Sequence, residues 1–174
     1  DRTLKVTTCY EFAENADAFS CKSILENLGD EEITIEGITS FCFGAAAGYE
    51  KDKSDPSEDV EIYYAHNTWS EECRWVHKKL KDVGIWAYGN LCYDRFRIAN
   101  HSGFSTGEYL PMGALYNKQT DTSVLWQIES STSWAYEVGC FTPEYRESFL
   151  KTDYRQQIYL QLLSLIHISE PTRP

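Results

Sequence analysis

Two strand-like segments in tandem govern the fold expected for this chain: Ser123-Val-Leu-Trp-Gln-Ile-Glu-Ser-Ser-Thr-Ser-Trp-Ala-Tyr-Glu-Val-Gly-Cys140. Apart from Leu125, large apolar residues alternate with other residue types in each segment, which is the period of a β-strand. If residues 131–133 form a three-residue turn, the two segments pair as a hairpin that sets Val124, Trp126 and Ile128 opposite Cys140, Val138 and Tyr136. A slip of one residue would set Glu137 opposite Trp126. We therefore expect a hairpin over 123–140 with one wholly apolar face.

The other face of this expected hairpin carries Gln127, Glu129 and Glu137. Glu129 and Glu137 would be diagonal neighbours about 7–8 Å apart. Inverting glycosidases place their two catalytic carboxyl groups roughly 6.5–9.5 Å apart, so a catalytic pair is one interpretation. A solvated surface with two ordinary carboxylates is the simpler one.

The same kind of pattern extends in both directions along the chain. Strand-like runs occupy 3–10, 19–28, 33–43, 60–64, 113–117 and 156–162. The sequence Gly29-Asp-Glu-Glu32 predicts a hairpin between 19–28 and 33–43, because glycine accepts a positive φ and aspartate bonds its own backbone. The polar, proline-containing segment 48–58 predicts an exposed loop. These signals predict an all-β fold, an antiparallel β-sandwich.

Charge and hydropathy exclude two kinds of partner. The 174 residues suffice for one domain. Their 16 Lys and Arg against 27 Asp and Glu give a net charge of -11, which repels a phosphate backbone, so we expect no nucleic-acid partner. No window approaches the roughly 20 apolar residues of a membrane helix, so we expect no membrane partner either.

The cysteines give no sign of a metal or redox site. They lie at positions 9, 21, 42, 73, 92 and 140, and no two form a CxxC pair. An even number permits disulfides, but we expect buried free thiols in a reducing compartment. This favours a cytoplasmic location with no cofactor, and secretion stays open because the chain does not begin with Met.

The two ends of the chain look incomplete or foreign. A strand-like run begins at once without a starting Met, so we expect a fold truncated at the N-terminus. The C-terminal run Leu163-Ser-Leu-Ile-His-Ile-Ser-Glu-Pro-Thr-Arg173 resembles the translation of a sequencing adapter. We therefore divide the chain into a partial β-domain, 1–162, and a non-native tail, 163–174.

Five motifs, in order along the chain, carry a family resemblance. The third is part of the run from Asn100 to Gly113, whose glycines among aromatic and hydroxyl residues predict a shaped loop. The motifs are Asn27-Leu-Gly-Asp30, Tyr64-Ala-His-Asn-Thr-Trp-Ser-Glu-Glu-Cys-Arg-Trp75, Ser105-Thr-Gly-Glu-Tyr-Leu-Pro-Met-Gly113, Trp126-Gln-Ile-Glu129 followed by Trp134-Ala-Tyr-Glu-Val-Gly139, and Gln157-Ile-Tyr-Leu-Gln-Leu162. In order and spacing they resemble the N-terminal domain of glycoside hydrolase family 36 α-galactosidases. The chain departs from that pattern at Ser130-Ser-Thr-Ser133, where the family usually has a His-Asn-Gly turn, and at Tyr136, near which a second Trp is common.

The resemblance implies a β-supersandwich of the galactose-mutarotase-like kind, which precedes a barrel that holds both catalytic aspartates. Such enzymes hydrolyse terminal α-galactosyl units of raffinose or melibiose with retention, through carboxyl groups about 5–5.5 Å apart. This sequence has no alternation of strands and helices from which a barrel site could be built. The resemblance therefore implies a non-catalytic domain, inactive alone, that supports the missing barrel and the contacts of a homo-oligomer, with a galactoside as the substrate.

The segment 68–83 gives conflicting signals. Trp69, Cys73, Val76, Leu80 and Val83 fall at helical spacing, and Thr68 with Glu71 would suit a capping box. The resemblance instead implies extended chain here. We follow the resemblance and expect a strand.

Six residues are candidates for substrate binding or for a domain interface: Asn67, Trp69, Arg74, Trp75, Glu108 and Tyr109. The two tryptophans would either stack on a sugar or fill the core, and the core is the simpler expectation. Arg74 would either pair with a buried carboxylate such as Glu129 or Glu137 or reach the barrel domain. We expect Glu108 to be solvated and Tyr109 to pack the loop against a neighbouring domain. The sequence Asn100-His-Ser102 matches a glycosylation sequon, which we interpret as coincidence.

A free-standing, lectin-like β-sandwich is the competing hypothesis. It would explain the 14% aromatic residues and the absence of a catalytic motif without any missing sequence. A purely structural interaction domain is a third possibility.

Overall fold

The computed structural model describes residues 3–35, 37–44, 46, 56–86, 94–130, 133–141 and 157–164. Within them the chain forms ten strands, one four-residue helix and one 3-10 turn. The strands are β1 (Leu4–Phe12), β2 (Phe19–Asn27), β3 (Ile38–Phe43), β4 (Val60–Thr68), β5 (Glu71–Lys79), β6 (Arg95–Asn100), β7 (Tyr109–Asn117), β8 (Thr122–Gln127), β9 (Trp134–Phe141) and β10 (Gln157–Ser164). Helix α1 covers Pro56–Asp59, and the 3-10 turn covers Leu80–Val83.

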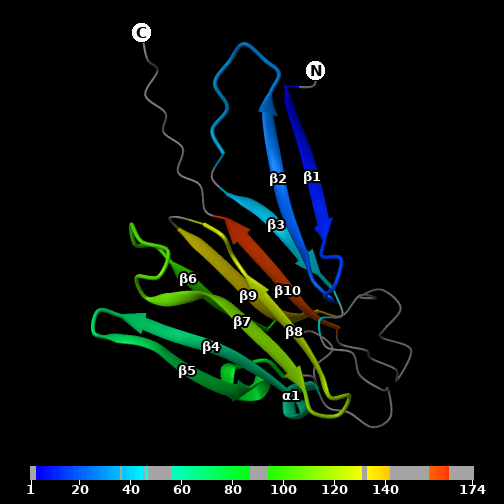
Figure 1. The fold of residues 1–174 in the computed structure, drawn as a ribbon, viewed down its shortest axis with the longest axis vertical. Coiled ribbons are helices and arrows are strands. Elements are labelled where there is room, and N and C mark those ends of the chain that lie inside the picture. Colours follow the sequence, from blue (N-terminus) through cyan, green and yellow to red (C-terminus); the bar gives the residue numbers. More distant parts are fainter. Residues whose placement is uncertain are drawn as a thin grey trace.

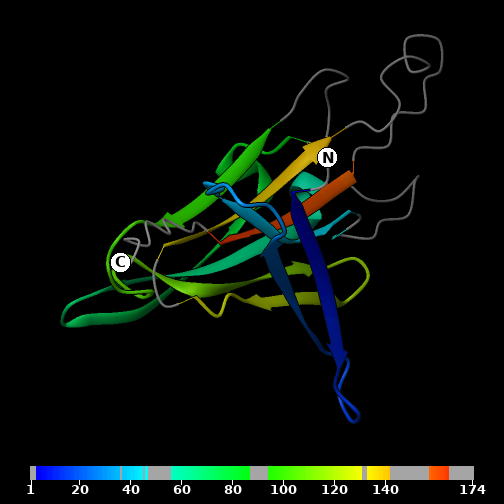
Figure 2. The same ribbon diagram turned by 90° about the horizontal axis from the view of Figure 1, so that it is seen from above.

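The strands form two four-stranded sheets and one separate ribbon. One sheet has the order β3-β10-β9-β6, the other has the order β5-β4-β7-β8, and β1 pairs only with β2. All pairings are antiparallel. Figures 1 and 2 show the two sheets as layers and the β1–β2 ribbon projecting away from them. The expected all-β sandwich is confirmed.

The core lies between the two sheets, and β9 shows why. Every residue of β9 from 134 to 140 is buried, and the large side chains at alternate positions, Trp134, Tyr136, Val138 and Cys140, belong to the core cluster. Ile158 and Leu160 of the neighbouring β10 are buried beside them. From the facing sheet come Val60, Ile62, Leu115 and Trp126. The period-2 pattern therefore predicts correctly which side chains face inward.

The hairpin expected over 123–140 does not form. β8 pairs with β7, whereas β9 pairs with β6 and β10, so the two segments lie in different sheets. Trp126 and Tyr136 meet across the core instead, with ring centroids 5.1 Å apart and an edge-to-face angle of 70°. The apolar side chains of a strand can be buried against a neighbouring strand of the same sheet or against a facing sheet. Here they are buried against the facing sheet.

The hairpin expected between 19–28 and 33–43 is also wrong. β2 pairs with β1 along its full length, and β3 pairs with β10. The turn that makes the first hairpin lies at 13–18, where Ala13 N donates to Ala18 O at 3.0 Å. Gly29 follows β2 and donates its N–H to Asn27 Oδ1 at 3.0 Å, so the glycine signal marks the end of a strand rather than a hairpin turn.

The strand expected within 68–83 is confirmed for 71–79, and the alternative helix is absent there. The chain then tightens into the 3-10 turn, which ends at Gly84 with a φ of 87°. Most of the loop expected over 48–58 lies outside the described residues. Its last part is different from the expectation, because Pro56 and Ser57 are buried in α1. β10 continues to Ser164, so Leu163 and Ser164 pair with both β3 and β9.

The five cysteines that the structure describes are free thiols. Only Cys140 is buried; Cys9 and Cys21 are half-buried, and Cys42 and Cys73 are exposed. The expectation of free thiols therefore holds for these five, and the expectation of burial holds for one, while Cys92 lies outside the described residues. No helix in the described part of the chain is long and apolar enough to cross a membrane.

A test of the core uses two tyrosines on opposite faces of one sheet. The Tyr136 hydroxyl is buried without a hydrogen-bond partner among the described residues, and burial raises its pKa. Since an unsatisfied buried hydroxyl costs about 1–3 kcal/mol, Tyr136→Phe should raise the free energy of unfolding by about 1 kcal/mol, measured by urea denaturation.

Tyr159→Phe is the matched control for that substitution. The Tyr159 hydroxyl donates to the Glu137 carboxylate at 2.6 Å, so its removal should lower stability by about 1–3 kcal/mol. Equal effects of the two substitutions would contradict this account of the core.

Candidate functional site

The structure brings the candidate residues Asn67, Trp69, Arg74, Glu108 and Tyr109 to one end of the β5-β4-β7-β8 sheet. Two segments form this end, the β4–β5 hairpin at 67–74 and the β6–β7 connection at 101–109, and we call them together the tip. Figures 1 and 2 show both segments at the same end of the sandwich. The candidate Trp75 lies just beyond the tip, on β5.

The hairpin presents Trp69 to solvent because of its turn geometry. Thr68 pairs with Glu71, which leaves Trp69 and Ser70 as the two turn residues. Ser70 has a φ of 65°, and its N–H donates to Glu72 Oε1 at 3.2 Å. Trp69 is 96% exposed, so the expectation that it fills the core is wrong.

Asn67 joins the two segments of the tip. It is buried, and its backbone N–H donates to Glu108 O at 2.8 Å. Its side-chain Nδ2 donates to Thr106 O at 2.6 Å, while Oδ1 accepts the N–H of Cys73 at 3.1 Å. Asn67 is therefore a positioning residue, whose amide nitrogen and oxygen both bond to backbone groups of the tip.

Two buried residues of the other sheet hold the 101–109 segment. Asn100 at the end of β6 donates from Nδ2 to Phe104 O at 2.5 Å, and Trp134 at the start of β9 donates from Nε1 to Ser105 O at 2.6 Å. Side chains of both sheets thus bond to backbone carbonyls of one short segment. The Asn100 side chain is fully buried, so the folded chain offers no acceptor at the sequon, in agreement with coincidence.

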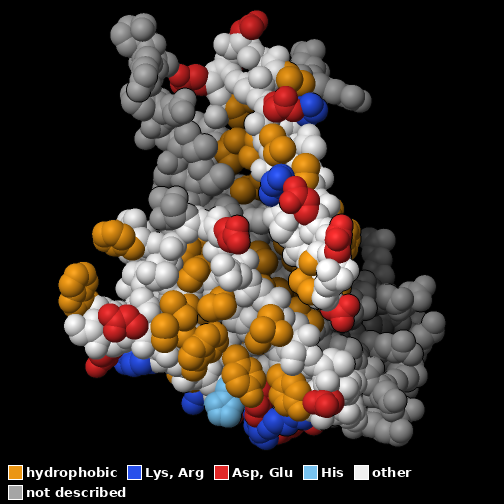
Figure 3. All heavy atoms as spheres, in the orientation of Figure 1, with side chains coloured by type: hydrophobic (Ala, Val, Ile, Leu, Met, Phe, Trp, Pro, Cys, Tyr) orange, Lys and Arg blue, Asp and Glu red, His pale blue; other side chains and the backbone are white. Residues whose placement is uncertain are grey.

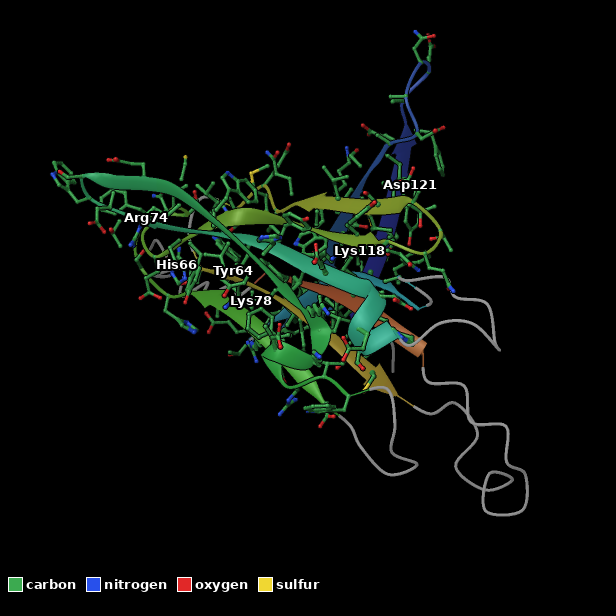
Figure 4. All side chains as sticks on the ribbon, turned by 90° about the horizontal axis from the view of Figure 1, so that it is seen from below. Tyr64, His66, Arg74, Lys78, Lys118 and Asp121 are labelled. Atoms are coloured by element: carbon green, nitrogen blue, oxygen red, sulfur yellow. The ribbon has the colours of Figure 1, made fainter. Side chains whose placement is uncertain are left out.

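An aromatic cluster lies beneath the tip. Tyr109 packs on His66 with ring centroids 4.8 Å apart, and Tyr64 contacts His66 at 5.6 Å and Phe96 at 5.5 Å. Figure 4 shows Tyr64 and His66 following one another along β4. Tyr109 therefore packs within the domain, whereas the sequence led us to expect contact with a neighbouring domain.

Arg74 makes a local ion pair at the surface. Its Nη1 lies 3.0 Å from Glu71 Oε2, and both side chains are largely exposed. The alternative in which Arg74 pairs with Glu129 or Glu137 is wrong, because its partner is Glu71, and Glu137 accepts from the Tyr159 hydroxyl at 2.6 Å and lies 3.9 Å from Arg95 Nη1. Glu129 and Glu137 cannot form the carboxylate pair of a single hairpin either, since β8 and β9 lie in different sheets. Glu108 is exposed as expected.

Trp75 belongs to a different surface, the outer face of the β5-β4-β7-β8 sheet. It stands opposite Ala65 and is 52% exposed, so the core expectation fails here too. Leu125, 76% exposed, lies across the same face beside Ala114. Figure 3 shows hydrophobic side chains gathered on this face. We call the exposed Trp75 and Leu125 side chains, together with the half-buried Ala114, the outer patch, while Ala65 opposite Trp75 is itself fully buried.

A polar cluster borders the outer patch on this face, because its Tyr63 pairs with both Ala114 and His77. The Glu61 carboxylate pairs with Lys118, accepts from the Tyr63 hydroxyl at 3.0 Å and lies 3.6 Å from His77 Nδ1. These interactions, led by the hydrogen bond from Lys118, lower the pKa of Glu61 although its burial opposes them. Figure 4 shows Lys118 and Asp121 at one end of the sheet and Arg74 at the other, so the cluster is separate from the tip.

The tip offers a surface suited to binding. It offers two highly exposed aromatic faces, Trp69 and Phe104 at 96% and 78%, beside the charged pair of Arg74 and Glu71. Aromatic faces of this kind stack on sugar rings or anchor protein interfaces. No group of three His, Cys, Asp or Glu side chains that could hold a metal is found within the described ranges.

Several residues that build the tip escaped the sequence analysis. Asn100 and Trp134 hold the 101–109 segment, and Phe104 adds an exposed ring. A polar residue at the end of an apolar strand, followed by a glycine-rich run, is the signal that could have pointed to Asn100. Comparisons of the chain with protein-family models, with curated proteins and with solved structures found no match.

A test of the tip compares two glycines of the same segment. A Cβ at Gly107 would lie 2.0 Å from Ser102 Oγ and 2.7 Å from Ser102 Cβ, whereas a Cβ at Gly103 would meet nothing within 4 Å. Gly107→Ala should displace the segment and lower stability by about 1–3 kcal/mol, the usual cost of overpacking. Gly103→Ala should change it by less than about 0.5 kcal/mol. Hydrogen exchange of amides 101–109 would report the displacement, and equal protection in both variants would contradict it.

A second test uses the pH dependence of the Glu61 cluster. A lowered pKa in the folded state means that the ionised carboxylate stabilises the fold above its ordinary pKa of 4.5 and that this contribution is lost as the pH falls through the folded value. Glu61→Gln should therefore be less stable than the wild type at pH 7. The difference should shrink below pH 4.5 in thermal denaturation at stepwise lower pH. A difference that is constant with pH would show that the ion pair is not its source.

Proposed function

We propose that this chain is the N-terminal, non-catalytic domain of a retaining α-galactosidase that hydrolyses terminal α-galactosyl units of galacto-oligosaccharides such as raffinose or melibiose. In this proposal the domain supports a catalytic barrel outside the chain, contributes to the contacts of a homo-oligomer, and works in the cytoplasm without a cofactor. The parent protein is a glycoside hydrolase, and the chain alone is inactive.

The observation that carries the proposal is the convergence of three of the resemblance motifs. Asn67 belongs to the second motif, Ser105 and Thr106 to the third, and Trp134 to the fourth. Asn67 bonds to Thr106 O at 2.6 Å and Trp134 to Ser105 O at 2.6 Å. These hydrogen bonds join residues of the second, third and fourth motifs. They give a physical reason for the three motifs to occur together in this order and spacing.

Two further features favour a structural role for this domain over a catalytic one. The described residues contain antiparallel sheets without the parallel strand and helix repeats on which barrel active sites are built. The outer patch and the tip both leave large apolar side chains in water, and surfaces of that kind are typical of contacts with other domains.

A free-standing carbohydrate-binding sandwich is the second candidate. The exposed rings of Trp69 and Phe104 favour it, because they would serve a sugar ring without any further domain. The codons that follow position 162 in the source gene separate the two. A barrel with paired aspartates would support the enzyme, whereas a stop codon directly after the β-domain would overturn it in favour of the lectin.

Activity measurements give a further prediction. We expect the chain alone to leave a nitrophenyl α-galactoside intact. In the parent enzyme, Trp69→Ala should raise KM for raffinose several-fold with little change in kcat, because the tip would contact substrate away from the reacting bond.

Trp86→Ala is the matched control, because Trp86 is also an exposed tryptophan but lies away from the tip. Its carbonyl accepts from Cys140 Sγ, at the end of β9 opposite to Trp134. Hydrolysis by the chain alone, or equal kinetic effects of the two substitutions, would count against the proposal.

A further inference from the structure

The β1–β2 ribbon is a two-faced element with one apolar side. Its register pairs Phe12 with Phe19 and Val6 with Leu25, so large apolar residues gather on one face. The other face holds two ion pairs, Lys5 with Glu26 at 2.5 Å and Lys22 with Glu11 at 2.9 Å. A lone two-stranded ribbon is marginally stable in water. This one packs on β3 through β2, by Phe19 on Phe41 at 5.4 Å and by Cys21 Sγ donating to Ser40 O at 3.2 Å, and pairing along β1 would stabilise it further.

The free edge of β1 is open to such pairing. Within the described ranges β1 has β2 as its sole ladder partner, and the ladder runs over nine residue pairs without a bulge. Figure 1 shows β1 on the outer side of the ribbon and β2 on the side toward β3. Natural edge strands are usually protected by proline, by a bulge, by being short or by charged side chains. Within β1 the charges Lys5 and Glu11 are present, whereas proline and a bulge are absent and the strand is nine residues long.

The sequence of β1 is complementary to itself. In an antiparallel pair of two β1 strands centred on Thr8, Leu4 meets Phe12 of the other copy and Val6 meets Tyr10. On the opposite face, Lys5 meets Glu11 of the other copy twice, once on each side of the two-fold axis. Apolar residues thus face apolar residues, and each lysine faces a glutamate.

No neighbouring register does as well. Centring the pair on Thr7 or on Cys9 removes both pairs between Lys5 and Glu11. A register centred between two residues sets apolar side chains opposite charged ones and mixes the two faces. Cross-strand pairs stabilise antiparallel sheets according to such matches, so the register centred on Thr8 is favoured.

We propose that two copies of this chain associate through their β1 edges, in antiparallel register about Thr8, to form a continuous four-stranded sheet β2-β1-β1-β2. The partner at the free edge of β1 is a second copy of the chain, because the charges of β1 match those of another β1 that runs in the opposite direction. In one copy, the side chains of Tyr10 and Phe12 are 52% and 76% exposed. In the dimer, the apolar face to which they belong would extend across both ribbons. This inference is independent of the proposed enzymatic role.

The first test is the mass of the full chain in solution. Sedimentation equilibrium in the high micromolar range should give a dimer in reversible exchange with the monomer. A chain that stays monomeric throughout that range, or that forms only polydisperse aggregates, would overturn the proposal.

The second test exchanges charges without breaking the ribbon. One variant carries Lys5→Glu with Glu26→Lys, and the other carries Glu11→Lys with Lys22→Glu, so each retains the ion pair inside its own ribbon. Each variant alone would set like charges against each other between copies, and we expect its dissociation constant to rise about tenfold or more. An equimolar mixture should restore dimerisation, because unlike charges then meet. Unchanged self-association of either variant would overturn the proposal.

The third test identifies the edge and the register. Directly opposite residues of antiparallel strands have Cα atoms about 4.5–5.5 Å apart, within the reach of a disulfide. Thr8→Cys should therefore yield a cross-linked dimer on mild oxidation, with a peptide linked through position 8 in mass spectrometry. Ile24→Cys, on β2, is the control, and cross-linking through position 24 instead of position 8 would assign the contact to the wrong edge and overturn the inference.

Discussion

The contact on which this fold depends is the edge-to-face packing of Trp126 on Tyr136 between the two sheets. Trp126 comes from β8 and Tyr136 from β9, and Trp134 stacks on Tyr136 with centroids 5.9 Å apart and an interplanar angle of 5°. These rings fix the distance and the offset between the layers, because large aromatic side chains pack with specific geometry. The smaller aliphatic residues of β4, β7 and β10 fill the space that remains.

Two glycines show how closely this packing is fitted. A Cβ at Gly113 would lie 2.6 Å from the Trp126 ring and 2.9 Å from Tyr63 O, and a Cβ at Gly139 would lie 2.6 Å from the Tyr159 ring. In both places a glycine stands directly opposite an aromatic residue of the neighbouring strand. Each ring covers the backbone of the glycine, an arrangement known to stabilise glycines in sheets.

Much of the secondary structure followed from the sequence, but the pairing of strands did not. The alternation in 134–140 predicted the inward residues of β9, since the period of a strand determines the face of each side chain. It carries no information on whether the apolar partner lies beside the strand or across the core, so it does not distinguish a hairpin that pairs 123–129 with 134–140 from the contact of Trp126 and Tyr136 across the core. The turn at 13–18 lacks glycine and proline, so no glycine or proline signal marks the hairpin of β1 and β2. Gly29 gives a stronger turn signal, and the hairpin predicted there is wrong.

The tip was predictable in its residues but not in their roles. Hydrophobicity suggested that Trp69 is buried, yet its place in a two-residue turn overrides that tendency. The bonds from Asn67 to Thr106 and from Trp134 to Ser105 span 39 and 29 positions of sequence. No local pattern reports such bonds, because they depend on how two sheets are stacked.

The way in which the 101–109 segment is fastened has a mechanical consequence. Asn67 holds it from one sheet, whereas Asn100 and Trp134 hold it from the other, so the segment acts as a clasp across one end of the sandwich. Sliding one layer over the other would require these bonds to rupture together. Under a shearing load the layers should therefore part first at the end remote from the clasp.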